Sequence, residues 1–316
     1  MHPRNPGRIE TDMTQTVLIT GASGFLGDAI ARALNERGDD VWGLSRGQRE
    51  AEAGDPVSRW HRYGAEGGLP PVAVDGVDAV VHLAGESVVG RWTAAKKNRI
   101  RDSRVLGTRA VVKALEAAGE ARPKVLLSAS AIGFYGDRGD EMLNESAPSP
   151  ENDFLAEVCR AWEAEAMEAT RLGVRVVMLR IGLVMHPRGG ALKAMLRPFR
   201  LGLGGRMGTG RQWQSWIHRD DLVRLALFAL DTDSLEGPVN ATAPTPVTQK
   251  DFARSLGKAI GRPSFMPAPA FALRAALGEF AVELLSSKRV LPRAANDAGF
   301  SFLHPDLDGA LADLLD

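Results

Sequence analysis

Three glycines near the start of the chain have a spacing that suits the binding of a phosphate chain. Gly21, Gly24 and Gly27 follow one another at three-residue intervals in VLITGASGFLG, between an apolar run at 17–19 and a helix expected over 25–37. The first glycine permits a tight turn, the second lets a pyrophosphate approach the backbone, and the third lets helix and strand pack closely. The N-terminus of the helix would direct free N–H groups and a positive dipole end at the phosphates. An ordinary strand–loop–helix is the alternative, but the flanking strand and helix favour a dinucleotide site.

The end of the second expected strand indicates which dinucleotide would bind. This strand covers 40–44 and is followed by Ser45 and Arg46. An NAD site commonly has an acidic residue here, about 20 residues past the glycines, to hold the ribose hydroxyls. The chain has no acid at this position, since Asp39 and Asp40 lie at the other end of the strand. A hydroxyl and a guanidinium suit a 2′-phosphate, so we favour NADP(H) over NAD(H), with solvated surface residues as the alternative.

The fourth expected strand, at 78–83, also ends in residues that suit a bound cofactor. Ala84 and Gly85 follow it, and their small size would allow close approach at the carboxyl end of the strand, where ligands bind in doubly wound sheets. The helix expected over 94–118 begins with a basic half. Its simplest interpretation is a solvated face. Alternatively, one of its arginines, Arg104, lies over the cofactor.

Hydroxyl groups follow the fifth expected strand, at 124–127. Ser130 stands at its carboxyl end, where side chains are placed for chemistry. A glycine-rich loop at 132–140 then carries Tyr135, one of two tyrosines in the chain. His82 falls inside the fourth strand, where a core histidine with satisfied hydrogen bonds is favoured over a base, and no other histidine has metal-ligand spacing to it. We therefore expect Ser130 and Tyr135 to line the crevice, and we expect no metal site.

Alternating strands and helices would position all of these groups. Beyond those named, strands are expected at 59–62, 174–179 and 238–241, and helices at 153–171, 192–201, 222–230, 248–260, 271–285, 287–295 and 306–315. The pattern predicts an α/β fold: a Rossmann-type doubly wound parallel sheet with a smaller C-terminal, α-rich substrate-binding part. The dinucleotide-binding domain would comprise residues 14–184 with return segments at about 217–242, and the substrate-binding part residues 185–216 and 243–316. Residues 1–12, polar with two prolines, are expected to form a disordered leader.

Composition excludes several classes of function. Lys and Arg together number 39, as do Asp and Glu, so the formal net charge is zero, and no long block of like charge exists to hold a nucleic acid. The single cysteine, Cys159, rules out an internal disulfide framework and a cysteine-based zinc site. No apolar run reaches the length of a membrane span, and no signal-peptide core is visible. We expect a cytoplasmic protein that acts on a small molecule, as a monomer or a homodimer.

Several stretches of the chain resemble a known superfamily. They are LITGASGFLG, VVHLAGE, RWTAAKKNRIRDSR, SASAIGFYGD, DFLAEVCRAWE, PFRLGLGGRMGTGRQWQSWIHRDDL and SKRVLPRAANDAGFSF. Together they resemble the short-chain dehydrogenase/reductase superfamily in its extended, nucleotide-sugar-epimerase-like branch. More narrowly, they are similar to an atypical subgroup of epimerase-like oxidoreductases whose substrate is unknown. The resemblance extends over residues 14–316.

The resemblance implies a role for particular positions. Those matching the cofactor-binding residues of the subgroup are Gly21, Ser23, Gly24, Phe25 and Leu26 at the phosphate turn, Ser45 and Arg46 at an NADP-type adenosine phosphate, Leu83, Ala84 and Gly85 along the cofactor, Arg104 facing it, and Gly182 to Val184 near the nicotinamide. Ser130 falls where the superfamily carries its catalytic serine. Gly27 completes the glycine turn.

One departure from the superfamily pattern bears on catalysis. The usual acid/base is a tyrosine with a lysine four residues later, but Phe154 and Val158 occupy the expected positions, and Tyr135 is followed by Gly139. We therefore weigh two main functions. The first is an NADP(H)-dependent, epimerase-like oxidoreductase on a small polar substrate, with non-standard catalysis by Ser130 and Tyr135. The second is an NADP(H)-binding sensor or scaffold with little or no turnover. A true nucleotide-sugar epimerase would need a tyrosine base that the chain lacks.

Overall fold

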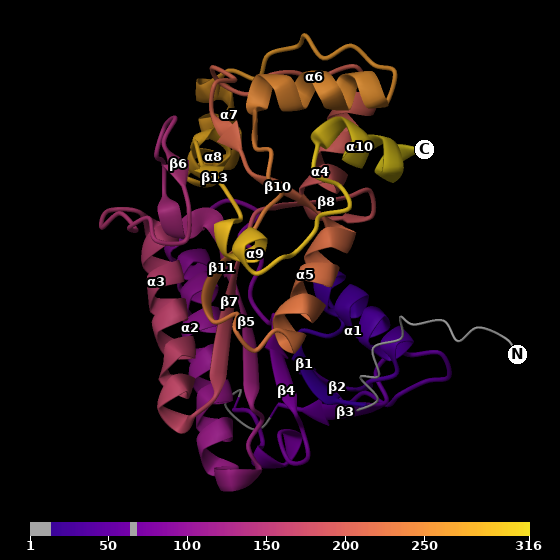
Figure 1. Cartoon of the computed structure of the whole chain (residues 1–316). Helices are drawn as coiled ribbons and strands as arrows, with labels where there is room; N and C mark the ends of the chain where they lie inside the picture. Colours follow the sequence, from indigo (N-terminus) through magenta and orange to yellow (C-terminus); the bar gives the residue numbers. More distant parts are fainter. Residues whose placement is uncertain (1–13, 64–67) are drawn as a thin grey trace, which may run out of the picture.

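The centre of the molecule is a parallel sheet (Figure 1). The computed structural model describes residues 14–63 and 68–316. Within them, seven strands pair in parallel in the order β11-β7-β5-β4-β1-β2-β3. Their bounds are β1 (Thr16–Thr20), β2 (Asp40–Ser45), β3 (Arg59–Arg62), β4 (Ala79–His82), β5 (Val125–Ala131), β7 (Arg175–Ile181) and β11 (Gly237–Ala241). The order reverses between β1 and β4, which is the switch point where doubly wound sheets bind ligands.

Helices cover both faces of this sheet. The α-helices are α1 (Phe25–Arg37), α2 (Ala94–Ala117), α3 (Phe154–Met167), α4 (Gly190–Arg200), α5 (Arg219–Asp231), α6 (Gln249–Ala259), α7 (Ala270–Leu277), α8 (Phe280–Leu285), α9 (Arg293–Asp297) and α10 (Leu307–Leu315). Short 3-10 helices are η2 (Pro71–Ala73), η3 (Gly119–Ala121), η4 (Ile132–Tyr135) and η5 (Glu168–Leu172). Figure 1 shows α2 and α3 side by side along one face, with α1 and α5 on the other.

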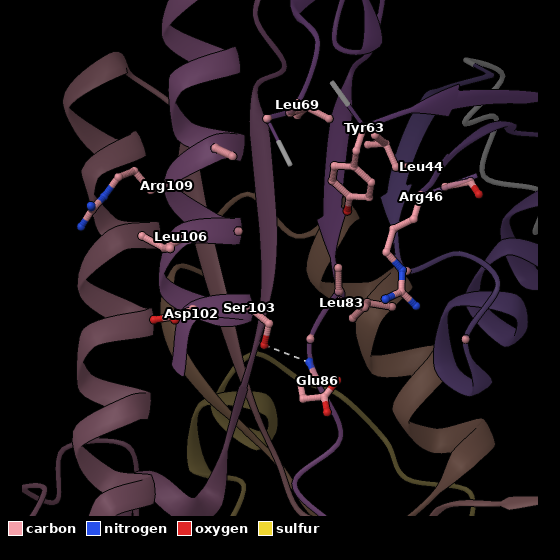
Figure 2. A pocket seen from close by; sticks show the side chains of 18 of the residues that line it. Leu44, Arg46, Tyr63, Leu69, Leu83, Glu86, Asp102, Ser103, Leu106 and Arg109 are labelled. Atoms are coloured by element: carbon pink, nitrogen blue, oxygen red, sulfur yellow. Dashed lines mark hydrogen bonds between the residues drawn. The ribbon is translucent and has the colours of Figure 1, made fainter. Parts of the chain in front are cut away.

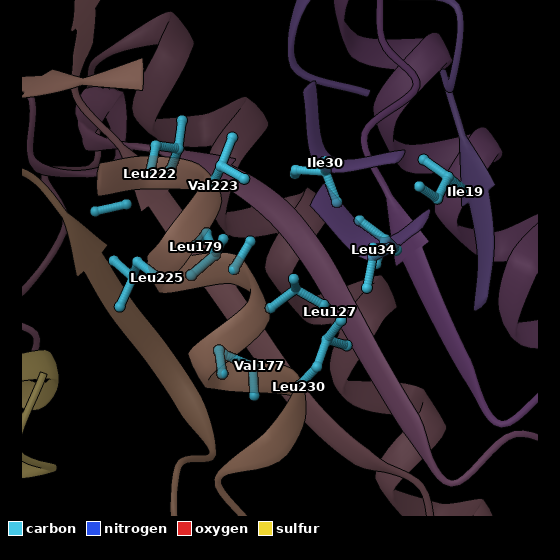
Figure 3. Packing of buried hydrophobic residues seen from close by; sticks show 14 of the residues in the cluster. Ile19, Ile30, Leu34, Leu127, Val177, Leu179, Leu222, Val223, Leu225 and Leu230 are labelled. Atoms are coloured by element: carbon cyan, nitrogen blue, oxygen red, sulfur yellow. The ribbon is translucent and has the colours of Figure 1, made fainter. Parts of the chain in front are cut away.

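The core explains why the strands are apolar without interruption. Neighbouring residues of a strand point to opposite faces, so Leu18 packs with the α2 side of the sheet while Ile19 packs with the α1 and α5 side. Figure 3 shows the apolar cluster on the α1 and α5 side, in which Leu34 of α1 and Leu230 of α5 pack near Leu127 of β5. A strand covered on both faces cannot alternate polar and apolar residues, as the sequence pattern indicated.

The C-terminal elements gather at the carboxyl end of the sheet, at the top of Figure 1. Helices α4, α6 and α10 contribute to one apolar cluster there. Three small two-stranded sheets accompany them: β8 (Leu183–His186) with β10 (Trp216–His218), β9 (Trp213–Gln214) with β12 (Val247–Thr248), and β6 (Met142–Leu143) with β13 (Arg289–Val290). This end of the molecule therefore overlies the edge of the sheet at which cofactor and substrate are expected.

Most expected elements are found, with boundaries that shift by a few residues. The helix expected at 287–295 is wrong, because Arg289–Val290 pairs as the strand β13 and the helix α9 begins only at Arg293. The doubly wound parallel sheet and the α-rich C-terminal end are confirmed. The helix expected at 271–285 is divided at Gly278 into α7 and α8, because Gly278 adopts a φ of 61° that ends the first helix. The three small sheets were not predicted, since strands of two to four residues carry too little pattern. The expected leader at residues 1–12 lies outside the described residues.

Candidate functional site

A cavity of about 1210 Å³ opens at the switch point between β1 and β4. Figure 2 shows its walls: the ends of β2 and β3 on one side and the helix α2 on the other, with the segment after β4 between them. The lining residues are Gly21, Ser23, Gly24, Leu44, Ser45, Arg46, Gly47, Tyr63, Gly68, Leu69, Leu83, Ala84, Gly85, Glu86, Asp102, Ser103, Leu106, Gly107, Arg109, Ala110 and Lys113. Eight residues that the sequence assigned to the cofactor are thus brought together: Gly21, Ser23, Gly24, Ser45, Arg46, Leu83, Ala84 and Gly85.

The glycine turn fits closely against the end of β4. Gly21 has a φ of 76°, and a Cβ there would lie 3.1 Å from the backbone nitrogen of Ala84. The Oγ1 of Thr20 accepts hydrogen bonds from the N–H groups of Leu83 and Ala84, both at 3.2 Å. These contacts join the ends of β1 and β4 into one floor. Only a glycine at position 21 leaves the floor both turned and unobstructed.

His82 completes this floor as a structural residue. Its Nδ1 lies 2.7 Å from Thr20 Oγ1, and its Nε2 lies 3.0 Å from Thr108 Oγ1 of α2. The ring is buried, and burial lowers the pKa of His82 to about 4. At neutral pH the imidazole is therefore uncharged and hydrogen-bonded on both nitrogens. The expectation of a core histidine with satisfied hydrogen bonds is confirmed.

Ser45 and Arg46 stand at the carboxyl end of β2 and line the cavity. Figure 2 shows Arg46 on the wall opposite α2. Ser45 Oγ accepts from the N–H of Gly47 at 3.3 Å, so the strand ends in a tight turn. The acidic residues of the cavity, Glu86 and Asp102, come from the segment after β4 and from α2. Within the described residues, no carboxylate therefore occupies the β2 end of the cavity, and the cationic group there is Arg46.

One face of α2 forms the opposite wall, which the sequence analysis missed. Ser103, Leu106, Ala110 and Lys113 line the cavity at intervals of three or four residues, as one face of a helix must. The signal was present in that spacing. It was hidden because the set mixes a hydroxyl, a large apolar side chain, a methyl group and a cation, so no apolar stripe marks this face.

The tyrosine that lines the cavity is Tyr63, a second residue that the sequence analysis missed. It directly follows β3, and its N–H donates to the carbonyl of Ser45 at 3.1 Å, which holds it beside the β2 end. Burial raises the pKa of Tyr63 above its usual value. Its position after a strand end could have identified it, by the same rule that identified Ser45.

Glu86 and Arg104 frame the far end of the cavity. Glu86 Oε1 accepts from Lys96 Nζ at 2.7 Å, and this bond lowers the pKa of Glu86. Arg104 does not line the cavity, but its Nη1 donates to the carbonyl of Glu86 at 2.9 Å. Its guanidinium carbon would lie 3.4 Å from a Cβ at Gly85. Arg104 therefore braces the strip along which we expect the cofactor to lie.

The remaining predicted cofactor residues lie outside this cavity. Gly27 is buried in α1, and Leu26 packs against the core beneath the turn. Phe25 lines a separate, smaller cavity behind the turn. Val184 is only 8% exposed, in the short strand β8. Contact between these residues and a cofactor stays a prediction.

Ser130 and Tyr135 belong to a buried polar network instead of the cavity wall. Ser130 Oγ donates to Glu163 Oε1 at 2.6 Å, and Arg180 binds both carboxylate oxygens of Glu163 at 2.8 Å. The hydroxyl of Tyr135 accepts from Arg180 Nη1 at 2.9 Å and donates to Asn240 Oδ1 at 2.7 Å. The network therefore links β5, η4, α3, β7 and β11.

This arrangement corrects the expectation that both side chains line the crevice with the cofactor residues. Ser130 is 3% exposed and Tyr135 is fully buried, and neither borders the cavity. The physical reason is the buried pair of Arg180 and Glu163: the guanidinium uses the Tyr135 hydroxyl as an acceptor, and the carboxylate accepts from Ser130. Burial also raises the pKa of Tyr135, which keeps the phenol protonated at neutral pH. A catalytic role for either residue stays a prediction.

Apolar contacts surround the positions at which the superfamily pattern has its tyrosine and lysine. Phe154, the first residue of α3, packs edge-on against Trp92, with ring centroids 5.3 Å apart. Lys97 Nζ lies 5.1 Å from the centroid of the Phe154 ring. Val158 is 2% exposed. A phenylalanine and a valine have no group that exchanges a proton, so neither side chain can act as an acid or a base.

One group of side chains brings together atoms of the kind that bind metal ions. His218, His304 and Asp313 place ligand atoms within 4.8 Å of one another, although His218 lies far from the other two in the sequence. However, His218 Nδ1 accepts from the N–H of Asp220 at 3.1 Å, so its proton resides on Nε2 in the neutral ring. Nε2 lies 3.3 Å from Asp313 Oδ2. The tautomer thus favours an N–H donor facing a carboxylate over a metal ligand.

Cys159 is structural in its surroundings. The thiol is buried, lies 3.7 Å from the carbonyl oxygen of Ala131, and has a pKa raised to about 12 by burial. A thiol with this pKa is protonated at neutral pH and is not a nucleophile.

The helices of the described residues, 14–63 and 68–316, were compared with the length and apolar character of a membrane span. None of them is long and apolar enough to cross a membrane.

Comparisons with known proteins agree with this geometry. The model of the NAD dependent epimerase/dehydratase family matches residues 17–241, and a domain of unknown function, DUF1731, matches residues 268–314. The epimerase family protein YfhF of Bacillus subtilis is 36% identical over 299 residues, which cover 95% of this chain and 97% of that protein. A chloroplastic SDR39U1 homolog of Arabidopsis thaliana is 40% identical over 304 residues, covering 96% and 87%.

A solved structure shares the fold over nearly the whole chain. The human epimerase family protein SDR39U1 (isoform 2), crystallised with NADPH, superposes with a TM-score of 0.84 at 33% identity, covering 95% of this chain and 99% of that one. The family model spans the sheet from β1 to β11, and the full-length relatives include the C-terminal helices as well. This chain therefore belongs to the NAD dependent epimerase/dehydratase family.

Proposed function

We propose that the protein is an NADP(H)-binding, epimerase-like oxidoreductase that acts on a small polar substrate. The observation that carries the proposal is the shared cavity: the glycine turn and Arg46 line one space at the switch point of the sheet, and none of the described residues places a carboxylate at the β2 end of it. A guanidinium and a hydroxyl bind a 2′-phosphate, whereas a carboxylate would repel it. The NADPH in the crystal structure of human SDR39U1 supports the same choice.

The residues of the chain have distinct tasks in this proposal. The first turn of α1 binds the pyrophosphate, because its N-cap, Gly24, leaves the backbone N–H groups without a side-chain partner. Ser45 and Arg46 hold the 2′-phosphate. Leu83 to Gly85 lie along the cofactor, and Arg104 and Val184 approach it farther on. When bound, NADPH supplies a hydride, and the chain supplies its position and the exclusion of water.

The substrate would lie where the C-terminal elements overhang the carboxyl end of the sheet. We assign this part to residues 185–216 and 243–316, and the dinucleotide-binding part to 14–184 with return segments at about 217–242. Ser130 and Tyr135 stay the predicted catalytic residues. Since both are buried, the proposal requires that they act through the Arg180–Glu163 network, or that the loop around them opens.

A sensor or scaffold with little turnover is the second candidate function. The observation that favours it is the pair Phe154 and Val158, which places apolar side chains where proton transfer is expected. Such a protein would bind NADPH as tightly as an enzyme does, but it would not consume it. A screen of metabolites by thermal shift with NADPH present, followed by nicotinamide absorbance with each hit, separates the two candidates. Absorbance change with a hit supports the oxidoreductase, and stabilisation without absorbance change supports the sensor.

Cofactor choice can be tested by calorimetry on three proteins. The wild type should bind NADPH more tightly than NADH, and Arg46→Ala should lose about 1.5–3 kcal/mol of NADPH affinity while NADH affinity stays the same. Arg171→Ala is the matched control, because it removes an exposed arginine whose ion pair with Glu168 lies on η5, outside the cavity. An unchanged NADPH preference in Arg46→Ala would refute the assignment of this residue. Absence of NADPH binding to the folded wild type would refute both candidate functions.

A further inference from the structure

A second cavity, of about 350 Å³, lies behind the glycine turn. It shares only Ser23 and Gly24 with the large cavity, so the turn separates the two spaces. The residues that give it its character are Phe25, Arg49, Trp60, His186, Arg188 and Arg219, and we refer to it as the basic pocket. Arg46 lines the large cavity and not this one. The proposed cofactor site therefore leaves the basic pocket without an occupant.

Three arginines from three separate segments converge on the basic pocket. Arg49 follows β2, Arg188 stands in the turn between β8 and α4, and Arg219 is the first residue of α5. Arg219 binds its neighbour Asp220 at 2.8 Å. Within residues 14–63 and 68–316, the guanidinium of Arg188 makes neither a hydrogen bond nor an ion pair. All five of its N–H donors are available to a ligand.

The two carboxylates of the pocket are already engaged. Asp28 binds Arg32 of α1 at 3.0 and 3.1 Å. Asp55 accepts from the N–H of Val57 at 3.1 Å and from the indole of Trp60 at 3.2 Å, and it lies 3.9 Å from Arg49. Asp28 is paired with Arg32, and Asp55 offsets the charge of Arg49, so neither acid cancels the charge of Arg188. The pocket retains positive charge for an incoming anion.

His186 adds a neutral donor and an aromatic wall. Its Nδ1 accepts from the backbone N–H of Arg188 at 3.2 Å, which assigns the ring proton to Nε2. Burial and the charges of Arg219 and Arg188 lower the pKa of His186, so the ring is neutral at pH 7. The ring packs against Phe25 at 5.6 Å, and the guanidinium of Arg49 lies 4.1 Å from the centroid of Trp60. The pocket thus combines cationic forks with flat apolar surfaces.

We propose that the basic pocket binds a small phosphomonoester at a site separate from the cofactor. Guanidinium forks match phosphate oxygens in geometry and charge. The volume lies at the small end of the usual range for ligand sites, so a phosphorylated metabolite fits and a second dinucleotide does not. The aromatic walls accommodate the organic part of the ester, which inorganic phosphate lacks.

Calorimetry with glycerol 3-phosphate, inorganic phosphate and glycerol tests the proposal on the whole chain without cofactor. We expect glycerol 3-phosphate to bind at one site, more tightly than inorganic phosphate, and glycerol not to bind. Arg188→Ala should weaken binding by about tenfold or more. This side chain is exposed in a turn, so the variant should fold. Arg171→Ala and Arg46→Ala should leave the affinity for glycerol 3-phosphate unchanged.

A second titration places the site relative to the cofactor. With NADPH at saturation, glycerol 3-phosphate should still bind, and Arg188→Ala should still weaken it. Displacement of the phosphate by NADPH, its loss in Arg46→Ala, or unaltered binding in Arg188→Ala would overturn the proposal. Equal affinity for inorganic phosphate would overturn the choice of a phosphomonoester. NADPH titrated alone reports on the proposed function, so failure of one proposal is distinguishable from failure of the other.

Discussion

At the scale of single residues, the buried polar side chains form hydrogen bonds that join separate elements. The imidazole of His82 connects β1 with α2 through two threonines, and Arg180 connects β5, α3 and β11 through Glu163 and Tyr135. Buried polar groups of this kind cost little while every partner is present, and each becomes costly when one partner is lost. Substitution of these groups should therefore change the free energy of unfolding more directly than it changes activity.

Protonation of His82 should destabilise the fold in acid. Its pKa is about 4 in the folded chain and near 6.5 when unfolded, so the unfolded chain binds more protons between these values. Stability is therefore lost as pH falls through this window, by about 2 kcal/mol at pH 5. His82→Gln, which keeps hydrogen-bonding capacity without titrating, should show a smaller loss between pH 7 and pH 5 in urea unfolding. Arg171→Ala should retain the wild-type pH dependence, and the same dependence in His82→Gln would contradict the assignment.

Tyr135→Phe should separate a structural role from a catalytic one. The change removes a hydroxyl that serves both Arg180 and Asn240, so we expect the free energy of unfolding to fall by about 1–3 kcal/mol. Affinity for NADPH should stay at the wild-type value, because Tyr135 does not border the cavity. Urea unfolding and calorimetry measure the two quantities. Loss of substrate turnover at unchanged stability would instead support catalysis by this residue.

At the scale of elements, the contact between the glycine turn and α1 sets the position of the proposed phosphate site. A Cβ at Gly27 would lie 2.1 Å from the carbonyl oxygen of Gly21 and 2.8 Å from Cα of Ala22. Both atoms belong to the backbone, so neither can move aside as a side chain can. The helix therefore packs so close to the turn that only a residue without a side chain fits at position 27.

Gly27→Ala should thus displace α1 from the turn. We expect a loss of about 3 kcal/mol in the free energy of unfolding, with weaker NADPH binding because the first-turn N–H groups move. Gly47→Ala is the matched control, since a Cβ there meets nothing within 4 Å. Urea unfolding should show little change for this control. Equal stability of the two variants would show that the turn and the helix can separate without cost.

At the scale of the whole molecule, the C-terminal segment is fastened back onto the helix α5. Asp221, which is fully buried, accepts hydrogen bonds from the N–H groups of Leu303 and His304, both at 2.8 Å, and from Arg224 at 3.0 Å. Leu303 and His304 lie about eighty positions after Asp221 in the chain. One carboxylate thereby holds the loop that precedes α10 over the end of the sheet.

Asp221→Ala should loosen this end of the molecule. Two backbone donors and one guanidinium lose their acceptor, so we expect a loss of about 3 kcal/mol in stability. Hydrogen exchange should accelerate in residues 301–315 more than in the sheet. Asp297→Ala, which removes an exposed carboxylate paired with Arg293, serves as the control and should change neither quantity. Uniform acceleration over the whole chain would contradict a local role.

The sequence by itself determined the sheet, its glycine turn and eight residues of the wall of the large cavity. Local signals were sufficient there, because a buried parallel strand must be apolar throughout and a phosphate turn must be glycine-rich. Eight predicted residues, from Gly21 to Gly85, line one cavity for the same reason: all follow strand ends, and strand ends in a parallel sheet meet at one edge. The apolar residues Phe154 and Val158, at the positions that the resemblance gives to the usual dyad, are likewise read directly from the sequence.

Only the tertiary structure decided which side chains face the cavity and which are drawn inward. Ser130 and Tyr135 stand where strand-end chemistry is expected. Yet Ser130 is bound by Glu163, 33 residues away in the chain, and Tyr135 by Arg180, 45 residues away. Tyr63 follows a strand end and the Ser103 face of α2 has helical spacing, but only packing between the elements brings the two to one cavity. The basic pocket has the same origin, because Arg49, Arg188 and Arg219 share no local motif. Such groupings depend on distances across the fold, and no short-range pattern in the chain encodes them.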